Sequence, residues 1–404
     1  MSNIFAIDLG TTKFCLASIT YDKTFEKAKL DTVSVLSAGM KRGMLSDFFA
    51  AQKSLSSLIE LAEKEFDFDI NTATLGVSGT HLKSKFVTCQ IPIDSDHLVN
   101  SRLLDKIQTQ IKIENQVDGR EFIHISPYSY QIDSREWIVN PLGFSGSSLK
   151  SKHFIIEADK YYLADLVRLC NSCGISVSSL ISEQYASSQV TIPPLKKELG
   201  VVLLDIGGGT TDGMVFLNGK PSKVFTVNIG GQLMTNDLSI GFGIPFDEAE
   251  RIKILGGISS DHELTCHAVD FRGSTVNIDP RKASQILKAR IEELAIHVNK
   301  EIEPFKGLLQ GGIILTGGGS ELPGMVSLFA NVMHDVVVAK ADPVFGGNEN
   351  TGKIEASKFA SKYATVLGLL YYEFIRQRNN GKTVRFKNLN SFFSSFASWL
   401  KELT

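Results

Sequence analysis

Short apolar runs alternate along this chain with longer segments in which apolar residues recur at helical spacing. A strand buries a short run, whereas a helix buries a stripe, so the spacing distinguishes the two. The pattern predicts strands over 33–40 and 74–79, and helices over 47–65, 101–115, 158–169 and 283–302. This repeating strand-then-helix plan is typical of a three-layer α/β core. Between 82 and 154 the runs become short and alternating around one helix, which predicts a small α+β insertion.

Three apolar runs end in glycine-rich turns, at 8–12, 205–211 and 317–320. The first two share one plan, in which a strand reaches an aspartate, passes through glycine and two threonines, and returns as a second apolar run. This plan predicts two similar β-hairpins, 197 positions apart, in two similar half-domains. The third run leads into three glycines and a helix start that contains proline, which is typical of a strand-to-helix nucleotide contact.

Glycine turns allow backbone N–H groups to approach an anion, and threonine hydroxyls add donors. A single turn of this kind is usually only a tight hairpin, but three together favour a nucleotide site. A carboxylate at a strand end would repel phosphate and is better placed to hold hydrated Mg²⁺. The candidate metal residues are Asp8 and Asp205. The candidate phosphate and nucleotide contacts are Gly10, Thr11, Thr12, Lys13, Gly207, Gly208, Gly209, Thr210, Thr211, Gly317, Gly318, Gly319 and Ser320.

These turns resemble those of the actin, hexokinase and heat-shock-chaperone ATPase superfamily. Four further stretches resemble, more narrowly, the FtsA family of bacterial cell-division proteins. They are 42–44, 78–79, 140–146 and 241–253. The resemblance covers nearly the whole chain. It implies an α/β fold with duplicated actin-like (ribonuclease H-like) domains around a central nucleotide cleft, an α+β insertion that takes part in polymer contacts, and ATP with Mg²⁺ as cofactors.

The expected domain boundaries follow from these patterns and from the resemblance. We expect a first core domain over 1–81 and 155–197, an insertion over 82–154, and a second core domain over 198–231 and 306–375. A helical nucleotide- and partner-binding subdomain spans 232–305, a basic linker 376–389 and an amphipathic helix 390–404.

The resemblance also suggests roles for individual residues. Gly230, Gly231, Glu250 and Lys253 become candidates for the nucleotide, although a solvated i,i+3 ion pair would also explain Glu250 and Lys253. Lys288 and Arg290 become candidates for binding the C-terminal tail of the tubulin-like protein FtsZ, with a merely solvated helix face as the alternative. Glu183 begins a predicted helix, where it either positions the attacking water or is an ordinary N-terminal carboxylate.

The last segment carries one apolar stripe at helical spacing behind a basic linker. A terminal amphipathic helix commonly docks on its own core, but a stripe rich in Phe and Trp with serines opposite is typical of an interfacial membrane helix. We interpret it as a membrane-targeting helix, as the resemblance also implies. Its membrane-facing residues would be Phe392, Phe393, Phe396, Trp399, Leu400 and Leu403.

Composition excludes several alternatives. The net charge of −2 provides no general field for nucleic acid. Five scattered cysteines, an odd number, indicate a reducing cytoplasm. The N-terminus enters a strand at once, unlike a signal peptide, and the longest apolar span (363–375) is too short for a membrane helix.

We therefore expect an ATP-binding protein with slow hydrolysis that polymerises at the cytoplasmic face of the inner membrane, at the division septum. The resemblance alone implies that it anchors the FtsZ ring and helps to recruit later division proteins. The alternatives are a soluble small-molecule kinase of the same superfamily and another actin-like scaffold, such as a pilus-assembly protein.

Overall fold

The computed structural model describes residues 2–21, 28–94, 98–256, 266–332, 336–338 and 361–380. Two five-stranded sheets form its centre. The first contains β1 (Ser2–Leu9), β2 (Lys13–Tyr21), β3 (Ala28–Leu36), β6 (Thr72–Val77) and β10 (Ser176–Ser182). The second contains β11 (Val201–Ile206), β12 (Thr211–Leu217), β13 (Lys220–Val227), β16 (Ile313–Thr316) and β17 (Val336–Val338).

The two sheets have the same topology. The first runs β3-β2-β1-β6-β10 and the second β13-β12-β11-β16-β17. In each, the three consecutive strands are antiparallel, and the first of them then pairs in parallel with a later strand. The chain therefore repeats one β-rich unit, as the two similar hairpins predict.

Helices cover both faces of the first sheet. One face packs against α1 (Phe48–Phe66) and α3 (Lys160–Ser172). The other face packs against α4 (Glu183–Thr191) and α10 (Ala364–Asn380). The second sheet packs against α8 (Pro280–Ile302) and α9 (Met325–Val332). Burial on both faces explains why the central strands read as nearly continuous apolar runs.

The predicted helix over 47–65 shows how local sequence defines an element. Asp47 accepts a hydrogen bond from the Ala50 amide at 3.1 Å and so caps the first turn of α1. One face buries residues such as Leu55 and Leu58, and the helix ends where Asp67 adopts a left-handed conformation.

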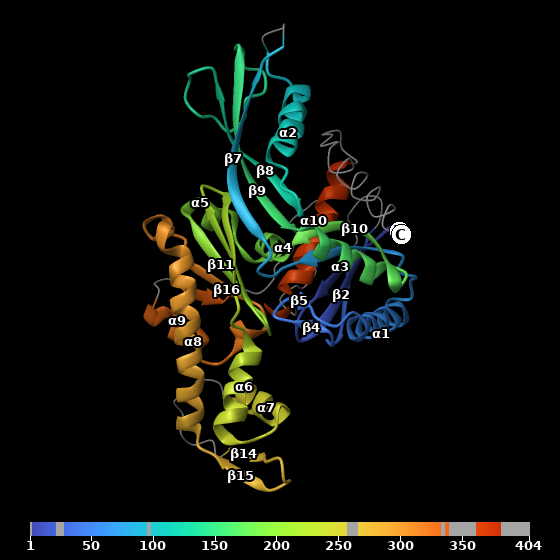
Figure 1. Cartoon of the computed structure of the whole chain (residues 1–404), viewed down its shortest axis with the longest axis vertical. Helices are drawn as coiled ribbons and strands as arrows, with labels where there is room; N and C mark the ends of the chain where they lie inside the picture. The colour runs from blue at the N-terminus through green and yellow to red at the C-terminus, as the bar shows by residue number, and fades with distance from the viewer. Residues whose placement is uncertain are drawn as a thin grey trace.

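The insertion lies at one end of the long axis of the molecule (Figure 1). Its sheet has the order β7-β9-β8, with β7 (Lys83–Pro92), β8 (Arg120–Ile132) and β9 (Ser148–Asp159), and α2 (Ser101–Asn115) covers one face. It is tied to both halves of the molecule. The Ser182 amide donates to the His124 ring at 3.3 Å, and the Val224 amide donates to the Ser84 hydroxyl at 3.0 Å.

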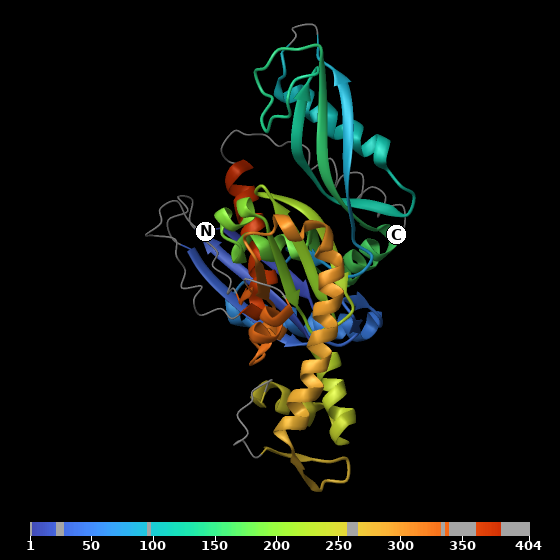
Figure 2. The same ribbon diagram turned by 90° about the vertical axis from the view of Figure 1, so that its left-hand side faces the viewer.

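A helical subdomain lies at the opposite end (Figure 2). It contains α6 (Gly231–Phe242), α7 (Phe246–Gly256), the hairpin of β14 (Cys266–Val269) and β15 (Thr275–Ile278), and the first part of α8. The described part of the chain also contains short elements: β4 (Met40–Lys41), β5 (Met44–Leu45), α5 (Pro194–Leu199), and the 3-10 helices η1 (Glu303–Leu308), η2 (Gly318–Glu321) and η4 (Ser361–Tyr363).

Several expectations can be compared with these elements. The helix over 101–115 is confirmed. The helix expected over 158–169 begins two residues later, because β9 continues to Asp159, whose carboxylate caps α3. The strand expected over 33–40 is wrong in its second half, since β3 ends at Leu36 and the chain turns at Gly39, where φ is +79°.

The expected domain boundaries stay predictions. The linker was expected over 376–389 and the amphipathic helix over 390–404. Positions 381–404 lie outside the described residues, so the structure says nothing of most of the linker or of any of that helix. In the part of the chain that is described, no helix combines the length and apolarity needed to cross a bilayer.

The crossing of α4 and α10 generates a stability prediction. A Cβ added at Gly368 would lie 2.1 Å from the Ala186 carbonyl oxygen, which is rigid helix backbone. Gly368→Ala should therefore separate the two helices and lower the free energy of unfolding by about 1–3 kcal/mol. Urea denaturation measures the change. Gly256→Ala at the end of α7, where a Cβ meets nothing within 4 Å, is the control, and equal stability of the two variants would contradict the prediction.

Candidate functional site

The turns of the two sheets meet face to face in a cleft between the halves. A Cβ at Gly208, in the β11–β12 turn, would lie 2.2 Å from the Thr12 side chain in the β1–β2 turn. A Cβ at Gly209 would lie 2.5 Å from the Thr11 hydroxyl. Only glycine permits this approach, so the glycines predicted from the sequence are required by the contact between the two turns.

The third glycine turn packs on the end of β11. Gly317 has a φ of +82°, and a Cβ there would lie 2.2 Å from the Asp205 carboxylate. A Cβ at Gly319 would lie 2.5 Å from the Ile206 side chain. The turn after β16 is therefore held against the strand that carries Asp205.

Four carboxyl groups line the same small cavity of about 110 Å³, at the bottom of the cleft. They come from equivalent and neighbouring elements. Asp8 and Asp205 occupy matching positions near the ends of β1 and β11, and Asp212 pairs with Asp205 across the β11–β12 ladder. Glu183 begins α4. This convergence places several negative charges beside the two glycine turns.

Hydroxyl groups hold two of these carboxylates in place. The Asp205 carboxylate accepts hydrogen bonds from Ser187 of α4 at 3.0 Å and from Thr365 of α10 at 2.9 Å. Because α4 and α10 cross at this point, they position Asp205 jointly.

Asp212 has an even denser set of donors. It accepts hydrogen bonds from Thr226 at 2.6 Å, Thr210 at 2.9 Å and Gln184 at 3.0 Å. Since this carboxylate is buried, these bonds fix its orientation toward the cavity.

Burial and mutual repulsion make the ionised forms of these carboxyl groups unfavourable, which raises their pKa values. Burial raises the pKa of Asp8 to about 7; Lys13 opposes the shift, and Asp205 and Asp212 add to it. Burial raises the pKa of Asp212 to about 6 despite its hydrogen bonds. The pKa of Glu183 is raised well above its ordinary value, first by burial and then by repulsion from Asp8 and Asp212. A cation bound among these groups would relieve this repulsion.

The small cavity opens into a larger one of about 590 Å³. Both are lined by Thr11, Thr12, Lys13, Gly207, Gly208, Gly318 and Lys362. The larger cavity continues to Gly231, Glu250 and Lys253 of the helical subdomain and to apolar side chains such as Met234 and Phe246. A polar bottom and a roomier, partly apolar mouth suit a ligand with an anionic end and a ring-bearing end.

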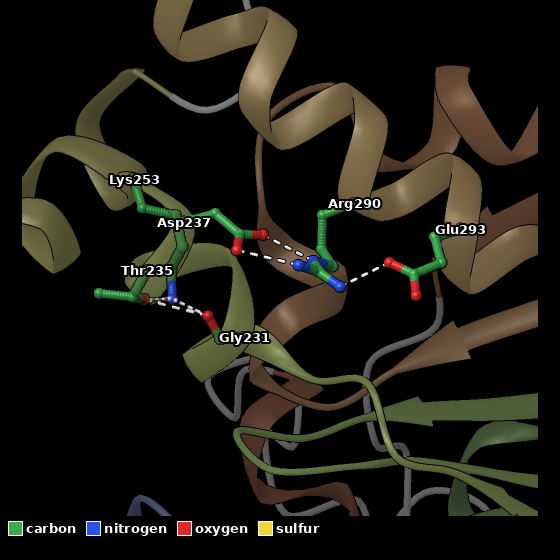
Figure 3. A network of polar contacts seen from close by, with 6 residues as sticks. All are labelled: Gly231, Thr235, Asp237, Lys253, Arg290 and Glu293. Atoms are coloured by element: carbon green, nitrogen blue, oxygen red, sulfur yellow. Dashed lines mark hydrogen bonds and ion pairs between the residues drawn. The ribbon is translucent and has the colours of Figure 1, made fainter. Parts of the chain in front are cut away.

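Lys253 joins the helices beside the larger cavity (Figure 3). Its ammonium donates to Glu250 at 2.7 Å, Thr235 at 2.9 Å and the Gly231 carbonyl at 3.2 Å. The first amide groups of α6 donate to the β11–β12 turn, from Gly231 to the Gly207 carbonyl at 2.9 Å. The ion pair of Glu250 and Lys253 therefore braces the wall of the cavity and is not simply solvated.

Comparison with known proteins identifies the family. A family model described as cell division protein FtsA matches residues 202–368, and one described as an SHS2 domain inserted in FtsA matches 79–157. The cell division protein FtsA of Escherichia coli strain K12 is 27% identical over 382 residues, which cover 91% of this chain and 88% of that protein. The chain belongs to the FtsA family.

A second curated FtsA, from Buchnera aphidicola subsp. Baizongia pistaciae, is 27% identical over 431 residues, covering 99% of this chain and 97% of that protein. Solved structures support the expected fold. A PilM–PilN type IV pilus biogenesis complex superposes with a TM-score of 0.60 at 15% identity, over 92% of this chain and 98% of that chain. MreB5 of Spiroplasma citri bound to ADP superposes with a TM-score of 0.54 at 14% identity, over 95% and 99%. The expected actin-like α/β fold is confirmed.

Most residues expected at the nucleotide line the cleft of this FtsA-family protein, but three do not. Thr211 is buried and donates to the Ile229 carbonyl at 2.8 Å. Ser320 is buried and donates to the Gly317 carbonyl at 2.7 Å. Gly230 precedes α6 as its N-cap. These residues shape the turns around the cleft and are absent from the linings of the two cavities described.

Lys13 lies in the cleft, as expected, and also contacts the chain segment before α10. It lines both cavities, but its ammonium donates to the Lys362 carbonyl at 2.5 Å and lies 4.2 Å from the centre of the Tyr363 ring. It thus connects the β1–β2 turn to the segment that leads into α10.

Sequence reasoning missed several lining residues of the small cavity. They are Gly43, Ser78, Asp212, Lys362 and Thr365. Asp212 follows the two threonines of the predicted motif and was the easiest to find. Thr365 lies within an apolar helical pattern, so its contact with Asp205 had no signal in the sequence.

The donor set fits a hydrated cation better than a directly bound one. Four carboxyl groups share the small cavity, yet in the described segments no three His, Cys, Asp or Glu side chains are close enough together to hold a metal ion directly. Mg²⁺ characteristically keeps several waters and uses only one or two carboxylates, so Asp8 and Asp205 fit as ligands through water.

The two expected partner residues lie on α8. Lys288 is exposed. Arg290 is about a quarter exposed and bonds both carboxylate oxygens of Asp237 on α6, at 2.6 and 2.9 Å, and Glu293 at 2.5 Å (Figure 3). Its guanidinium thus joins α8 to α6.

The raised pKa of Asp8 predicts a pH-dependent stability in the absence of metal and nucleotide. A carboxyl group with a raised pKa stabilises the folded state at low pH, and this contribution is lost as pH rises from about 4 to about 7. Asp8→Asn should therefore increase the free energy of unfolding only modestly at about pH 5, early in this range, and much more at about pH 8, as measured by urea denaturation. Exposed Asp69→Asn is the control. If Asp8→Asn changed the free energy of unfolding equally at both pH values, the pKa of Asp8 would not be raised in the folded protein.

Proposed function

We propose that this protein binds ATP with Mg²⁺ between its two halves and hydrolyses it slowly, acting mainly as a scaffold in cell division. The observation that carries the proposal is the continuous cleft, in which two glycine turns and buried carboxylates lead into a larger, partly apolar cavity. The turns would hold phosphates through their amide groups, and the larger cavity would hold adenosine beside Glu250 and Lys253. The ADP-bound MreB5 structure shares the fold.

Asp8 and Asp205 would hold Mg²⁺ through water, where the ion would supply charge neutralisation for the phosphates. Glu183 is the candidate that positions the attacking water. Burial and the neighbouring carboxylates raise the pKa of Glu183, which a hydrogen bond from Ser78 partly offsets, and this increases its basicity toward a nearby water.

We further propose that the protein polymerises. Exposed apolar side chains occur at both ends of the long axis, and include Trp137, Val139 and Phe144 in the insertion and Phe271 beside the β14–β15 hairpin. Exposed apolar groups at opposite ends favour a head-to-tail contact between copies, which generates a filament when the rotation does not close.

The membrane proposal rests on the sequence of 390–404 and on family membership. The protein would bind the cytoplasmic face of the inner membrane through this helix, tether the FtsZ ring at the septum and help to recruit later division proteins. Each large apolar side chain contributes about 1.5–3 kcal/mol on burial, so one short helix binds reversibly and polymerisation strengthens attachment.

Co-sedimentation with anionic liposomes tests this anchor. With Mg²⁺ and ATP, the full chain should sediment with lipid, whereas a chain ending at Asn388 should stay in the supernatant. The truncated chain must still bind nucleotide, which shows that it is folded. If both chains remain soluble, the helix packs on the protein core and the anchoring proposal is wrong.

The FtsZ tail is proposed to bind at α8, through Lys288 and Arg290. Arg290 has two possible roles, because its guanidinium also joins α8 to Asp237 on α6. Exchanging the charges of Arg290 and Asp237 distinguishes a direct contact of Arg290 with the peptide from a role in holding α8 against α6.

Arg290→Asp should weaken binding of a peptide with the sequence of the cognate FtsZ tail at least about tenfold, as expected when one partner of a charge pair is removed. The double variant Asp237→Arg with Arg290→Asp restores the ion pair but moves the cation. If Arg290 touches the peptide, the double variant should remain weak in a fluorescence titration. Recovery of binding would show that Arg290 only braces the helices.

A further inference from the structure

A third turn, from outside the two matching hairpins, also reaches the bottom of the cleft. The hairpin of β4 and β5 places Arg42 and Gly43 at its apex. The Gly43 amide donates to the Thr11 hydroxyl at 2.9 Å, and Gly43 lines the small cavity. On the opposite side, a Cβ at Gly209 would lie 2.8 Å from the Arg42 Cα. The apex therefore touches both glycine turns at once.

The side chain of Tyr162 on α3 holds the apex of this hairpin in place. The Tyr162 hydroxyl of α3 donates to the Gly43 carbonyl at 3.3 Å and accepts from the Leu45 amide at 3.1 Å. These bonds hold the hairpin in the cleft.

Arg42 is an unusual residue for this position. Both apex residues have positive φ, +52° at Arg42 and +72° at Gly43. Tight hairpins with two such residues strongly favour Asn, Asp or Gly at the first position, because other side chains are strained there. Backbone strain of this kind often occurs at ligand clamps and other functional sites, so a function of the side chain is worth testing here.

The charges of the cavity indicate what that function is. Its lining contains four carboxyl groups but, among the described residues, only two cationic side chains, Lys13 and Lys362. The Lys13 ammonium already donates to the Lys362 carbonyl. Arg42 is exposed and makes no hydrogen bond or ion pair with any described residue, so its guanidinium is free to turn toward an anion held by the adjacent turns.

We propose that Arg42 supplies a guanidinium to the terminal phosphate of a bound nucleoside triphosphate, so that the β4–β5 hairpin distinguishes a triphosphate from a diphosphate. This role rests on the proposed nucleotide function. A diphosphate lacks the phosphate group that Arg42 would contact. A triphosphate would gain a charge-assisted, bidentate hydrogen bond from the Arg42 guanidinium, which belongs to the first half of the molecule. The same hairpin touches Gly209 of the second half, so the contact would form where the two halves meet.

The test compares affinities for ADP and for a non-hydrolysable ATP analogue, both with Mg²⁺, by isothermal titration calorimetry on the full chain. Arg42→Gly removes the guanidinium but suits the positive φ, so it preserves the turn. It should weaken binding of the triphosphate about tenfold, as expected for one charged hydrogen bond, and change ADP binding less than twofold. Arg42→Lys should retain part of the preference. Lys41→Ala, at the neighbouring exposed lysine, should behave as wild type.

The proposal is wrong if Arg42→Gly keeps the wild-type ratio of the two affinities. It is equally wrong if both affinities fall together, because that result would assign Arg42 a role in supporting the turn only. If the wild-type protein binds neither nucleotide, the nucleotide function itself fails, and the wild-type titrations reveal this before any variant is compared.

Discussion

The convergence of four carboxyl groups between two closely opposed turns constrains the rest of this structure. Negative charges placed together away from bulk water repel one another, and the raised pKa values of Asp8, Asp212 and Glu183 express that cost. The surrounding sequence offsets part of it with hydroxyl and amide donors from four different elements. A cation bound among these groups would relieve the remaining repulsion, so the arrangement has the charge distribution of a site prepared for a ligand.

The crossing of α4 and α10 explains how the carboxyl groups of the site are held in fixed positions. Small residues at the crossing let the helix backbones approach, and each helix sends one hydroxyl group to the same oxygen of Asp205. On the other side of the cleft, the first turn of α6 is bonded to the carbonyl groups of the β11–β12 turn. Asp237 on the same helix holds Arg290 of α8. Helix α6 thus makes polar contacts both with the turn at the cleft and with α8 of the helical subdomain.

The sequence predicted the parts of this arrangement that depend on neighbours along the chain. The apolar spacing predicted α1 and α2, and the repeated Asp-Gly-Thr-Thr plan predicted the two matching hairpins. Features that depend on distant neighbours were missed or misplaced. Thr211 was expected at the ligand, but the alternation of side chains along β12 directs it to Ile229. Thr365 gave no signal, because its role arises only from the crossing of two helices that are far apart in the sequence.

The insertion is hydrogen-bonded to both halves of the molecule, through His124 to β10 and through Ser84 and Tyr128 to β13. A body fixed to two supports cannot keep both attachments unchanged if the distance between the supports changes. Any narrowing or widening of the cleft must therefore tilt the insertion or break some of these bonds. Because its sheet and α2 extend far from these attachments, a small displacement at the cleft would become a larger displacement at the outer end of the insertion (Figure 1). The insertion is, in mechanical terms, a lever arm that pivots where it is attached to the two halves.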